Sequence, residues 1–389
     1  MPLETSAPSR VGLIGFYVLV FAATGITLPY LPAYLKSLDL SATEVGVLLT
    51  IGPTLAMVVP SLWGQVADRT GRPDRVLTLL VVGSAAFFVP LLFVQRFAVL
   101  FGVLCVYGLF STGISTLIDS LTLHHVALRG GSYARIRVFG SMGFVAASTA
   151  FGALVNRVDV TAVAVPLALL ALAAAWSLTL TARVPSSGHA PSLLGALSLA
   201  RSARLWPFLA AACIHWIACA PWNGSLAIHL AALHLPTYVV GLAAGMGVVA
   251  EIAAMLAYPR FADRVAPRHL LFVSFAASAA RWAGMALTSD AATIVALSAL
   301  HGLTFGTFYV ASVAYVARRV PVSLRSSGQA LFVSVAFGVG GLVGLLSGGA
   351  AYDAFGGRWL FGAAAVVELV AAAVALGLKP PTPAGLLAE

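Results

Sequence analysis

The sequence predicts an all-α membrane protein whose helices form two six-helix bundles. Of the 389 residues, 60% are hydrophobic and 9% are charged, whereas a soluble domain carries about 25% charged residues. A bilayer span needs about 20 apolar residues, and the chain divides into about twelve such segments with no room for a separate soluble domain. The longest polar interruption lies near the middle of the chain, as a linker between two equal halves should.

The spans of the first half follow from their apolar runs and the turns between them. The first covers about 11–36 and carries Pro29 and Pro32, which bend helices and are tolerated where they line a cavity or face other helices. The second ends in the polar turn GQVADRTGRPDR. The remaining four are expected at about 74–94, 97–123, 134–155 and 161–182.

In the second half the seventh span covers about 206–233 and the eleventh about 322–351. The other four spans each contain one ionisable residue in apolar sequence: Glu251, Arg281, His301 and Glu368. GSMG in the fifth span and GVGGLVGLLSGG in the eleventh offer small residues for close helix packing. We therefore expect a first bundle over 1–183, a cytoplasmic linker over 184–205 and a second bundle over 206–389.

The net charge of +9 is explained by membrane topology rather than by nucleic acid. Arginines gather in alternate loops, and the other loops hold only Lys36, Arg96, Arg157 and Arg358. Because basic loops face the cytoplasm, both termini are expected there, in a bacterial-type inner membrane that the chain crosses many times. The expected partners are the bilayer, a small-molecule substrate and protons, with no nucleic acid, and we expect a monomer.

The fourth and fifth spans each deliver one charge to the membrane interior. Asp119 and Arg137 are equidistant from Leu128 in the turn between them, so they lie at the same depth, because each helix rises about 1.5 Å per residue. Charges there are costly unless paired or hydrated, and by default they mark a functional site. Phe144 lies two turns beyond Arg137 and could stack on a substrate, although a lipid- or core-facing ring explains its spacing slightly better.

Three further ionisable residues are level with one another in the second half. Ala266 is midway between Glu251 and Arg281, and Ala291 is midway between Arg281 and His301. Burial favours the protonated form of a carboxylate, whereas a nearby arginine favours the ionised form. A carboxylate balanced between these two effects is suited to load and release a proton. The simpler alternative is a buried charge cluster that only specifies packing.

Aromatic and polar residues complete the candidate cavity. The seventh span carries His215, Trp216, Trp222 and Asn223 on a polar-aromatic face. In the first span, a substrate contact and a position in the interfacial aromatic belt explain Tyr30 equally well. Glu368 is a lone carboxylate for which we expect a structural or near-interface role.

The sequence indicates neither a cofactor nor a metal site. The three cysteines, Cys105, Cys213 and Cys219, lie within apolar segments, where we expect neither a disulfide framework nor metal binding. His124 and His125 are adjacent, so they do not face one site on a helix. With no nucleophile–base spacing either, a membrane enzyme is the weakest hypothesis.

The turn after the second span matches the loop signature of the major facilitator superfamily at five positions: Gly64, Asp68, Arg69, Gly71 and Arg72. A weaker copy without the glycines occurs at 259–269. The resemblance implies a twelve-helix fold with pseudo-two-fold symmetry and a central cavity. It also implies that Asp68 and the two arginines help to hold the cytoplasmic side closed, as a charge-assisted latch would.

The resemblance narrows to the phenylpropionate permease group, which is similar to the lactose permease among proton-coupled facilitators. The stretches that carry it are LPYLPAYLKSL, LIDSLTL, YARIRVFGSMGF, MGVVAEI, RWAGM and LHGLTFGTF. By this resemblance Asp119 and Arg137 contact the substrate, Glu251 and His301 serve substrate and coupling, and Arg281 serves coupling. The branch implies proton symport of a small organic solute, driven by the proton gradient with no cofactor.

Three positions depart from the lactose permease. Phe144 replaces the tryptophan on which the sugar ring stacks, Thr304 stands in place of the principal proton-binding carboxylate, and Asn223 in place of an acidic residue. These departures leave Glu251 as the remaining carboxylate for protonation.

The leading hypothesis is a symporter that imports an aromatic carboxylate by rocking its two halves. Arg137 would pair with the carboxylate, and Phe144 and Trp222 would contact the ring. Two alternatives stay open: a sugar, glycoside or nucleoside symporter, and a non-transporting membrane sensor or scaffold.

Overall fold

The computed structural model describes residues 6–183, 205–260, 264–320 and 324–378. Within these ranges the chain is helical apart from turns and one isolated bridge, so the predicted all-α class is confirmed. By its contacts the chain divides into two compact units, Met1–Ala190 with Leu226–Gly245 and Pro191–Ser225 with Met246–Glu389. The predicted linker, apart from Leu205, lies outside the described residues.

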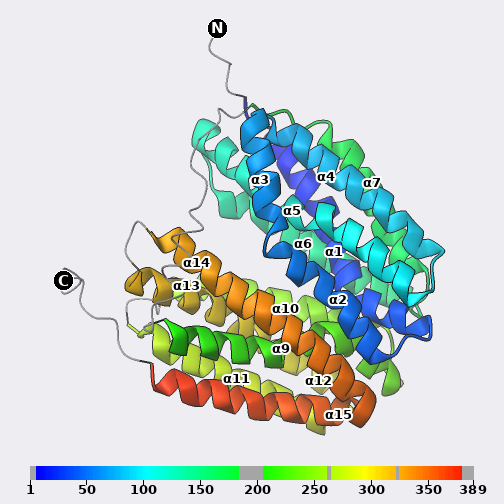
Figure 1. Ribbon diagram of the computed structural model, residues 1–389, viewed down its shortest axis with the longest axis vertical. Helices are drawn as coiled ribbons and strands as arrows, with labels where there is room; N and C mark the ends of the chain where they lie inside the picture. Colours follow the sequence, from blue (N-terminus) through cyan, green and yellow to red (C-terminus); the bar gives the residue numbers. More distant parts are fainter. Residues whose placement is uncertain (1–5, 184–204, 261–263, 321–323, 379–389) are drawn as a thin grey trace. The chain divides into compact units, whose positions relative to one another are not determined.

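The first unit contains the helices of the amino-terminal half, drawn from blue to green in Figure 1. They are α1 (Arg10–Ser37), α2 (Ala42–Ala56), α3 (Val59–Thr70), α4 (Pro73–Phe88), the 3₁₀ turn η1 (Val89–Leu92), α5 (Phe97–Arg129), α6 (Tyr133–Leu154) and α7 (Thr161–Ser177). α2 and α3 together make one span, and α1 stays continuous through both of its prolines.

The second half of the chain contributes a similar series of helices (Figure 1). They are α9 (Trp206–Ala232), α10 (Tyr238–Ala257), η2 (Tyr258–Arg260), α11 (Pro267–Leu287), α12 (Ala291–Ser298), η3 (Gly302–Thr307), α13 (Phe308–Arg319), α14 (Arg325–Val333), η5 (Ser334–Val339) and α15 (Gly340–Leu376). η3 and η5 are single π-helical turns. The end of α9 and the start of α10 belong to the first unit.

Glycines decide where two of the spans end. α5 continues to Arg129, six residues past the predicted end, because the first residue that breaks it is Gly130, whose φ of 76° only glycine adopts easily. α15 is interrupted at Gly356, where φ is 78°. That break divides one long helix into the eleventh and twelfth spans.

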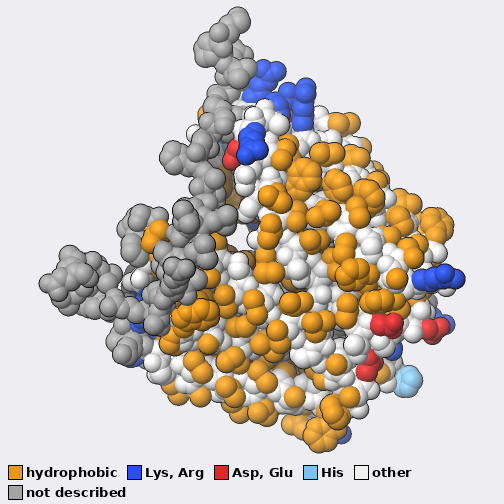
Figure 2. Space-filling model, in the orientation of Figure 1, with side chains coloured by type: hydrophobic (Ala, Val, Ile, Leu, Met, Phe, Trp, Pro, Cys, Tyr) orange, Lys and Arg blue, Asp and Glu red, His pale blue; other side chains and the backbone are white. Residues whose placement is uncertain are grey.

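The described part of the chain contains nine helices that are long and apolar enough to cross a membrane. Many of their large apolar side chains are exposed, among them Leu154, Leu287 and Trp359. Figure 2 shows hydrophobic side chains over most of the visible face, with Lys and Arg at its edges. Such a surface is stable where lipid rather than water surrounds it.

In the first unit α1 packs along α6 at two glycines. A Cβ built on Gly25 would lie 2.5 Å from the backbone oxygen of Phe144, and one on Gly143 would lie 2.7 Å from that of Val18. The backbones of the two helices therefore touch, which confirms the predicted use of the small residues in GSMG. In the second unit Gly340, Gly344 and Gly348 of α15 pack against α9 in the same way.

Gly25→Val is expected to destabilise the protein strongly, because the new side chain would meet backbone atoms that cannot turn away. Overpacking of this kind costs about 1–3 kcal/mol or more. Gly102→Val in α5 is the matched control, since nothing lies within 4 Å of a Cβ there. The measurement is the melting temperature in detergent; equal losses in the two variants would contradict the close α1–α6 contact.

Candidate functional site

In the first unit, the two charged residues predicted to lie at the same depth form an ion pair. α5 places Asp119 and α6 places Arg137, whose Nε lies 3.7 Å from Asp119 Oδ1. The side chains are 34% and 29% exposed. An ion pair this long and this exposed contributes at most about 1 kcal/mol, so Arg137 can exchange Asp119 for another anion at little cost.

Aromatic residues of α1 form the other wall of this site. The Tyr17 hydroxyl donates to Asp119 Oδ1 at 2.5 Å and holds that carboxylate in place. The guanidinium carbon of Arg137 lies 4.0 Å from the centroid of the Phe21 ring and 5.5 Å from that of Tyr17. A guanidinium stacked on an aromatic face is suited to a flat anion such as a carboxylate.

The sequence analysis missed Tyr17 and Phe21. Their spacing of four residues places them on one face of α1, which is the signal that could have found them. The sequence does not say, however, that this face points towards Arg137.

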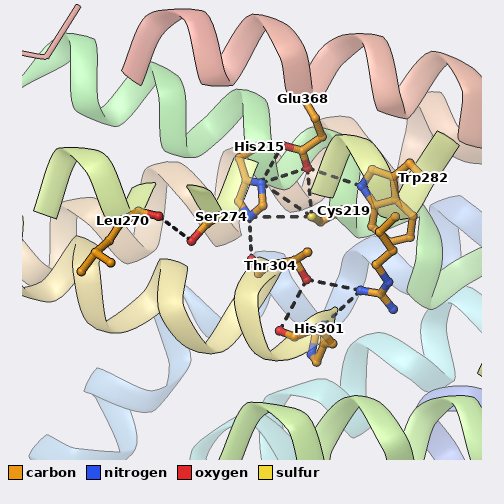
Figure 3. A network of polar contacts seen from close by, with 9 residues as sticks. His215, Cys219, Leu270, Ser274, Trp282, His301, Thr304 and Glu368 are labelled. Atoms are coloured by element: carbon orange, nitrogen blue, oxygen red, sulfur yellow. Dashed lines mark hydrogen bonds and ion pairs between the residues drawn. The ribbon is translucent and has the colours of Figure 1, made fainter. Parts of the chain in front are cut away.

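In the second unit the three level residues also form one chain of contacts, and Figure 3 shows the part of it around His301 and Thr304. Arg281 Nη1 lies 3.3 Å from His301 Nδ1 and 3.3 Å from Thr304 Oγ1. His301 Nε2 lies 3.8 Å from Glu251 Oε2. Because Arg281 can only donate, His301 Nδ1 accepts, and the ring proton is on Nε2, facing Glu251. The arrangement links a carboxylate to a guanidinium through one imidazole.

Two tryptophans enclose Arg281, which is only 2% exposed. Its guanidinium carbon lies 4.4 Å from the Trp222 ring and 4.6 Å from the Trp282 ring. Cation–π contact in a dry site offsets part of the cost of burying the charge. Trp282 is a third residue that the sequence analysis missed, although it directly follows Arg281.

His301 and Thr304 stand at the π-helical turn η3. A Cβ on Gly302 would lie 2.4 Å from the backbone oxygen of Ala250, so α10 approaches η3 closely. π-turns are rare and occur often at functional sites, because the extra residue shifts the side chains around the helix. Here the π-turn directly follows His301, which contacts both Glu251 and Arg281.

A third polar cluster lies in the core of the second unit, with Cys219 at its partly buried edge. His215 of α9 and Glu368 of α15 have no exposed side-chain surface, and His215 Nδ1 lies 2.8 Å from Glu368 Oε2. Cys219 Sγ lies 3.3 Å from Glu368 Oε1. The sequence-based placement of His215 on a cavity face therefore needs correction, since the two side chains pair in the core. Of the two roles expected for Glu368, the near-interface one is wrong, and the buried pair agrees with the structural one.

Cys219 also has surroundings that its apolar sequence did not indicate. Ligand-type atoms of His215, Cys219 and Glu368 lie within 4.8 Å of one another, an arrangement that is compatible with a metal ion. The same atoms already satisfy one another by hydrogen bonds, so the geometry does not require a metal.

A cavity of about 520 Å³ lies in the first unit, at the end of α1 opposite the loop after α3. Lys36, Arg157 and His234 are among the residues that line it. Tyr30 lies nearby in the same unit, fully buried, with its hydroxyl donating to the backbone oxygen of Ser148 at 3.0 Å. Tyr30 is therefore not a residue of the interfacial belt.

Comparison with known proteins decides the family. The model of the MFS_1 like family, within the major facilitator superfamily, matches residues 11–363. The chain belongs to this family. It is a membrane transporter rather than an enzyme, and the resemblance drawn from its motifs is confirmed.

Relatives of this MFS_1-like transporter are named for different solutes. The maltose permease of Geobacillus stearothermophilus is 28% identical over 352 residues, which cover 90% of this chain and 88% of the permease. The probable 3-phenylpropionic acid transporter of Escherichia coli (strain K12) is 29% identical over 334 residues, 83% of this chain and 86% of that protein.

Solved structures support the fold. The crystal structure of the nucleoside transporter NupG aligns with a TM-score of 0.87 at 18% identity, covering 95% of this chain and 98% of that one. An inward-facing bacterial homologue of the human lysosomal transporter Spinster aligns with a TM-score of 0.70 at 15% identity, covering 95% and 96%. The predicted major facilitator fold is confirmed.

Two residues expected to touch a substrate ring are used in packing in this transporter. Phe144 is 8% exposed, and its backbone packs on Gly25, while Phe21 takes the place beside Arg137. Trp222 is 9% exposed and stacks on Arg281. Asn223, the next residue of α9, is exposed.

The loop after α3 forms a different ion pair from the one expected. Arg72 donates from Nε and Nη2 to the two oxygens of Asp74, at 3.0 and 2.8 Å. Asp68 and Arg69 are exposed at the end of α3. Within the described residues, the carboxylate that pairs with Arg72 at 4.0 Å or less is thus Asp74, which the motif did not single out.

Proposed function

We propose that this chain is a proton-coupled symporter that imports a small organic acid, with an aromatic carboxylate as the leading substrate class. It would work by alternating access in a bacterial inner membrane, with both termini in the cytoplasm, as a monomer and without a cofactor. The loop that contains Asp68, Arg69 and Arg72 would help to close the cytoplasmic side.

The observation that carries this proposal is the environment of Arg137. Its guanidinium is stacked on Phe21, and its ion pair with Asp119 is long and partly exposed. A substrate carboxylate can take the place of Asp119, since Tyr17 continues to hold that side chain. The Phe21 ring then lies beside the guanidinium, where an aromatic or apolar substrate group can pack against it.

Proton coupling is assigned to the chain of Glu251, His301 and Arg281. Glu251 is the partly exposed carboxylate of this group, with 23% of its side chain accessible, so water can reach it. When Glu251 is protonated, its electrostatic attraction for His301 is lost. The positive charge of Arg281 is then no longer offset by the charge of Glu251. The charge of Glu251 can therefore control how the buried arginine is neutralised.

A sugar or nucleoside symporter is the second candidate. Its support is the naming of relatives, which include a maltose permease and a putative nucleoside transporter that is 25% identical over 362 residues. Asp119 can accept hydrogen bonds from ring hydroxyls as well as orient Arg137. Under this candidate Arg137 would bind a neutral solute less tightly than an acid.

Purified protein in proteoliposomes tests the proposal. With an imposed pH gradient, labelled 3-phenylpropionate is expected to accumulate, and the external medium should become more alkaline as protons enter with it. Maltose and uridine are the comparison solutes. Accumulation of one of them alone supports the second candidate, and absence of any flux supports a non-transporting sensor or scaffold.

A further inference from the structure

The buried pair of His215 and Glu368 is not used by the function proposed above. Glu368 lies in an apolar stretch of α15, and neither side chain has any exposed surface. Removing an ionised group from water costs several kcal/mol unless partners compensate it. A carboxylate in this position costs more free energy of folding than an apolar residue would, so packing alone does not explain it.

Hydrogen-bond geometry fixes the proton content of this pair. His215 Nε2 lies 3.0 Å from the backbone oxygen of Thr304, and a carbonyl only accepts, so Nε2 carries a proton. Nδ1 lies 2.9 and 2.8 Å from the two oxygens of Glu368. A bare ring nitrogen and a bare carboxylate would repel at this distance. At these distances one further proton therefore lies between them, on Nδ1 or on Glu368, and its loss requires the two side chains to move apart.

The groups around the pair come from α9 itself and from two other helices, α11 and α13. Trp282 of α11 donates from Nε1 to Glu368 Oε1 at 3.4 Å, and Cys219 of α9 donates to the same oxygen. Phe275 and Phe308 pack on the His215 ring, with centroids 4.8 and 4.4 Å away. These contacts enclose both side chains of the pair in the core of the second unit.

Arg281 is connected to this pair from two sides. It stacks on the ring of Trp282, whose N–H binds Glu368, and it donates to Thr304, whose carbonyl binds His215. With the shared proton in place the pair is neutral overall, and it does not offset the charge of Arg281. Without the proton, Glu368 is a net negative charge in the same network as the guanidinium.

We propose that His215 and Glu368 hold one exchangeable proton, and that its loss and return accompany changes in the partners of Arg281. The proton leaves Nδ1 or the carboxyl of Glu368, and Glu251 is the acceptor from which it can reach water. After the transfer His215 is neutral, Glu368 is ionised and Glu251 is neutral, so charge is conserved. The pair is then a second protonation site of the coupling machinery, an assignment that rests on the proposed proton coupling.

The protein alone provides the first test, since Trp282 touches Glu368 directly. Tryptophan emission of the detergent-solubilised wild type is expected to change with pH, and Trp282→Phe and Glu368→Gln should each remove that change. The amide of Glu368→Gln can still accept from Trp282 and donate to Nδ1, so the fold has a replacement for each bond. If the emission of both variants changes with pH as that of the wild type does, the proposal is wrong. If Glu368→Gln does not fold, the comparison of the wild type with Trp282→Phe is sufficient for this test.

Transport provides the second test, with whichever of 3-phenylpropionate, maltose and uridine the wild type accumulates. Glu368→Gln is expected to lower uphill accumulation by about tenfold or more while counterflow exchange stays within about threefold. Leu369→Ala, at the next and exposed position of α15, should leave both unchanged.

The two tests separate the pair from the symport mechanism. Wild-type accumulation that Glu368→Gln retains in full overturns the role of the pair and leaves proton symport standing. Equal loss of accumulation and exchange indicates a purely structural role and overturns it too. If the wild type itself shows no proton-driven uptake, the proposed function fails, and the emission titration still decides whether the pair exchanges a proton.

Discussion

Arg137→Gln is expected to weaken the binding of carboxylate substrates strongly. The change removes the guanidinium that lies over Phe21, and in the described part of the chain Arg137 is the basic residue that pairs with Asp119 at 4.0 Å or less. A charge-assisted hydrogen bond contributes about 1.5–3 kcal/mol, so affinity should fall about tenfold to a hundredfold. Isothermal calorimetry with 3-phenylpropionate measures the loss. Arg135→Gln, an exposed position on the same helix, is the matched control.

Arg137→Lys separates charge from shape. Lysine keeps the positive charge but loses the planar fork and the stacking on Phe21, so an intermediate loss is expected for a substrate that Arg137 binds through two parallel hydrogen bonds. If Arg137→Gln binds 3-phenylpropionate as tightly as Arg135→Gln does, the organic-acid assignment is wrong. Retained binding of maltose or uridine in Arg137→Gln would point to Asp119 as the principal contact.

The division of the chain into apolar spans and two of the three polar clusters could be predicted because two simple rules act on the sequence. Bilayer thickness sets the span length, and equal rise on two antiparallel helices sets equal depth. These rules bring Asp119 to Arg137 and join Glu251, His301 and Arg281, as the structure has them. Depth in the membrane, however, does not say towards which neighbour a side chain points.

The rotation of each helix about its axis was beyond sequence reasoning, and the errors arise there. Phe144 is on a face that packs against α1, and Phe21 is on the face that meets Arg137, which the sequence gives no means to decide. His215 and Glu368 are 153 residues apart in the chain, and each looks isolated until α9 and the part of α15 after Gly356 come into contact. A π-turn such as η3 also changes the direction in which the following side chains point around the helix axis, and glycines in the sequence are not enough to predict such a turn.

Glu251→Gln is expected to abolish uphill, proton-driven uptake while leaving counterflow exchange. The amide has the shape of the protonated carboxyl and can accept from His301 Nε2, so the cluster stays assembled but cannot release a proton. Exchange moves substrate both ways without net proton movement and needs only the neutral form. Accumulation should fall about tenfold or more, with exchange within about threefold of the wild type. Unchanged accumulation would remove Glu251 from the mechanism.

Comparison of Glu251→Gln with Glu368→Gln distinguishes an outer from an inner protonation site. Both variants are expected to lose uphill uptake, because a proton that passes between the two groups needs each of them. Only Glu368→Gln should lose the pH-dependent emission of Trp282, because Trp282 donates to Glu368. If Glu251→Gln also loses it, the two carboxyls titrate as one coupled system, and the proton belongs to both rather than to either residue.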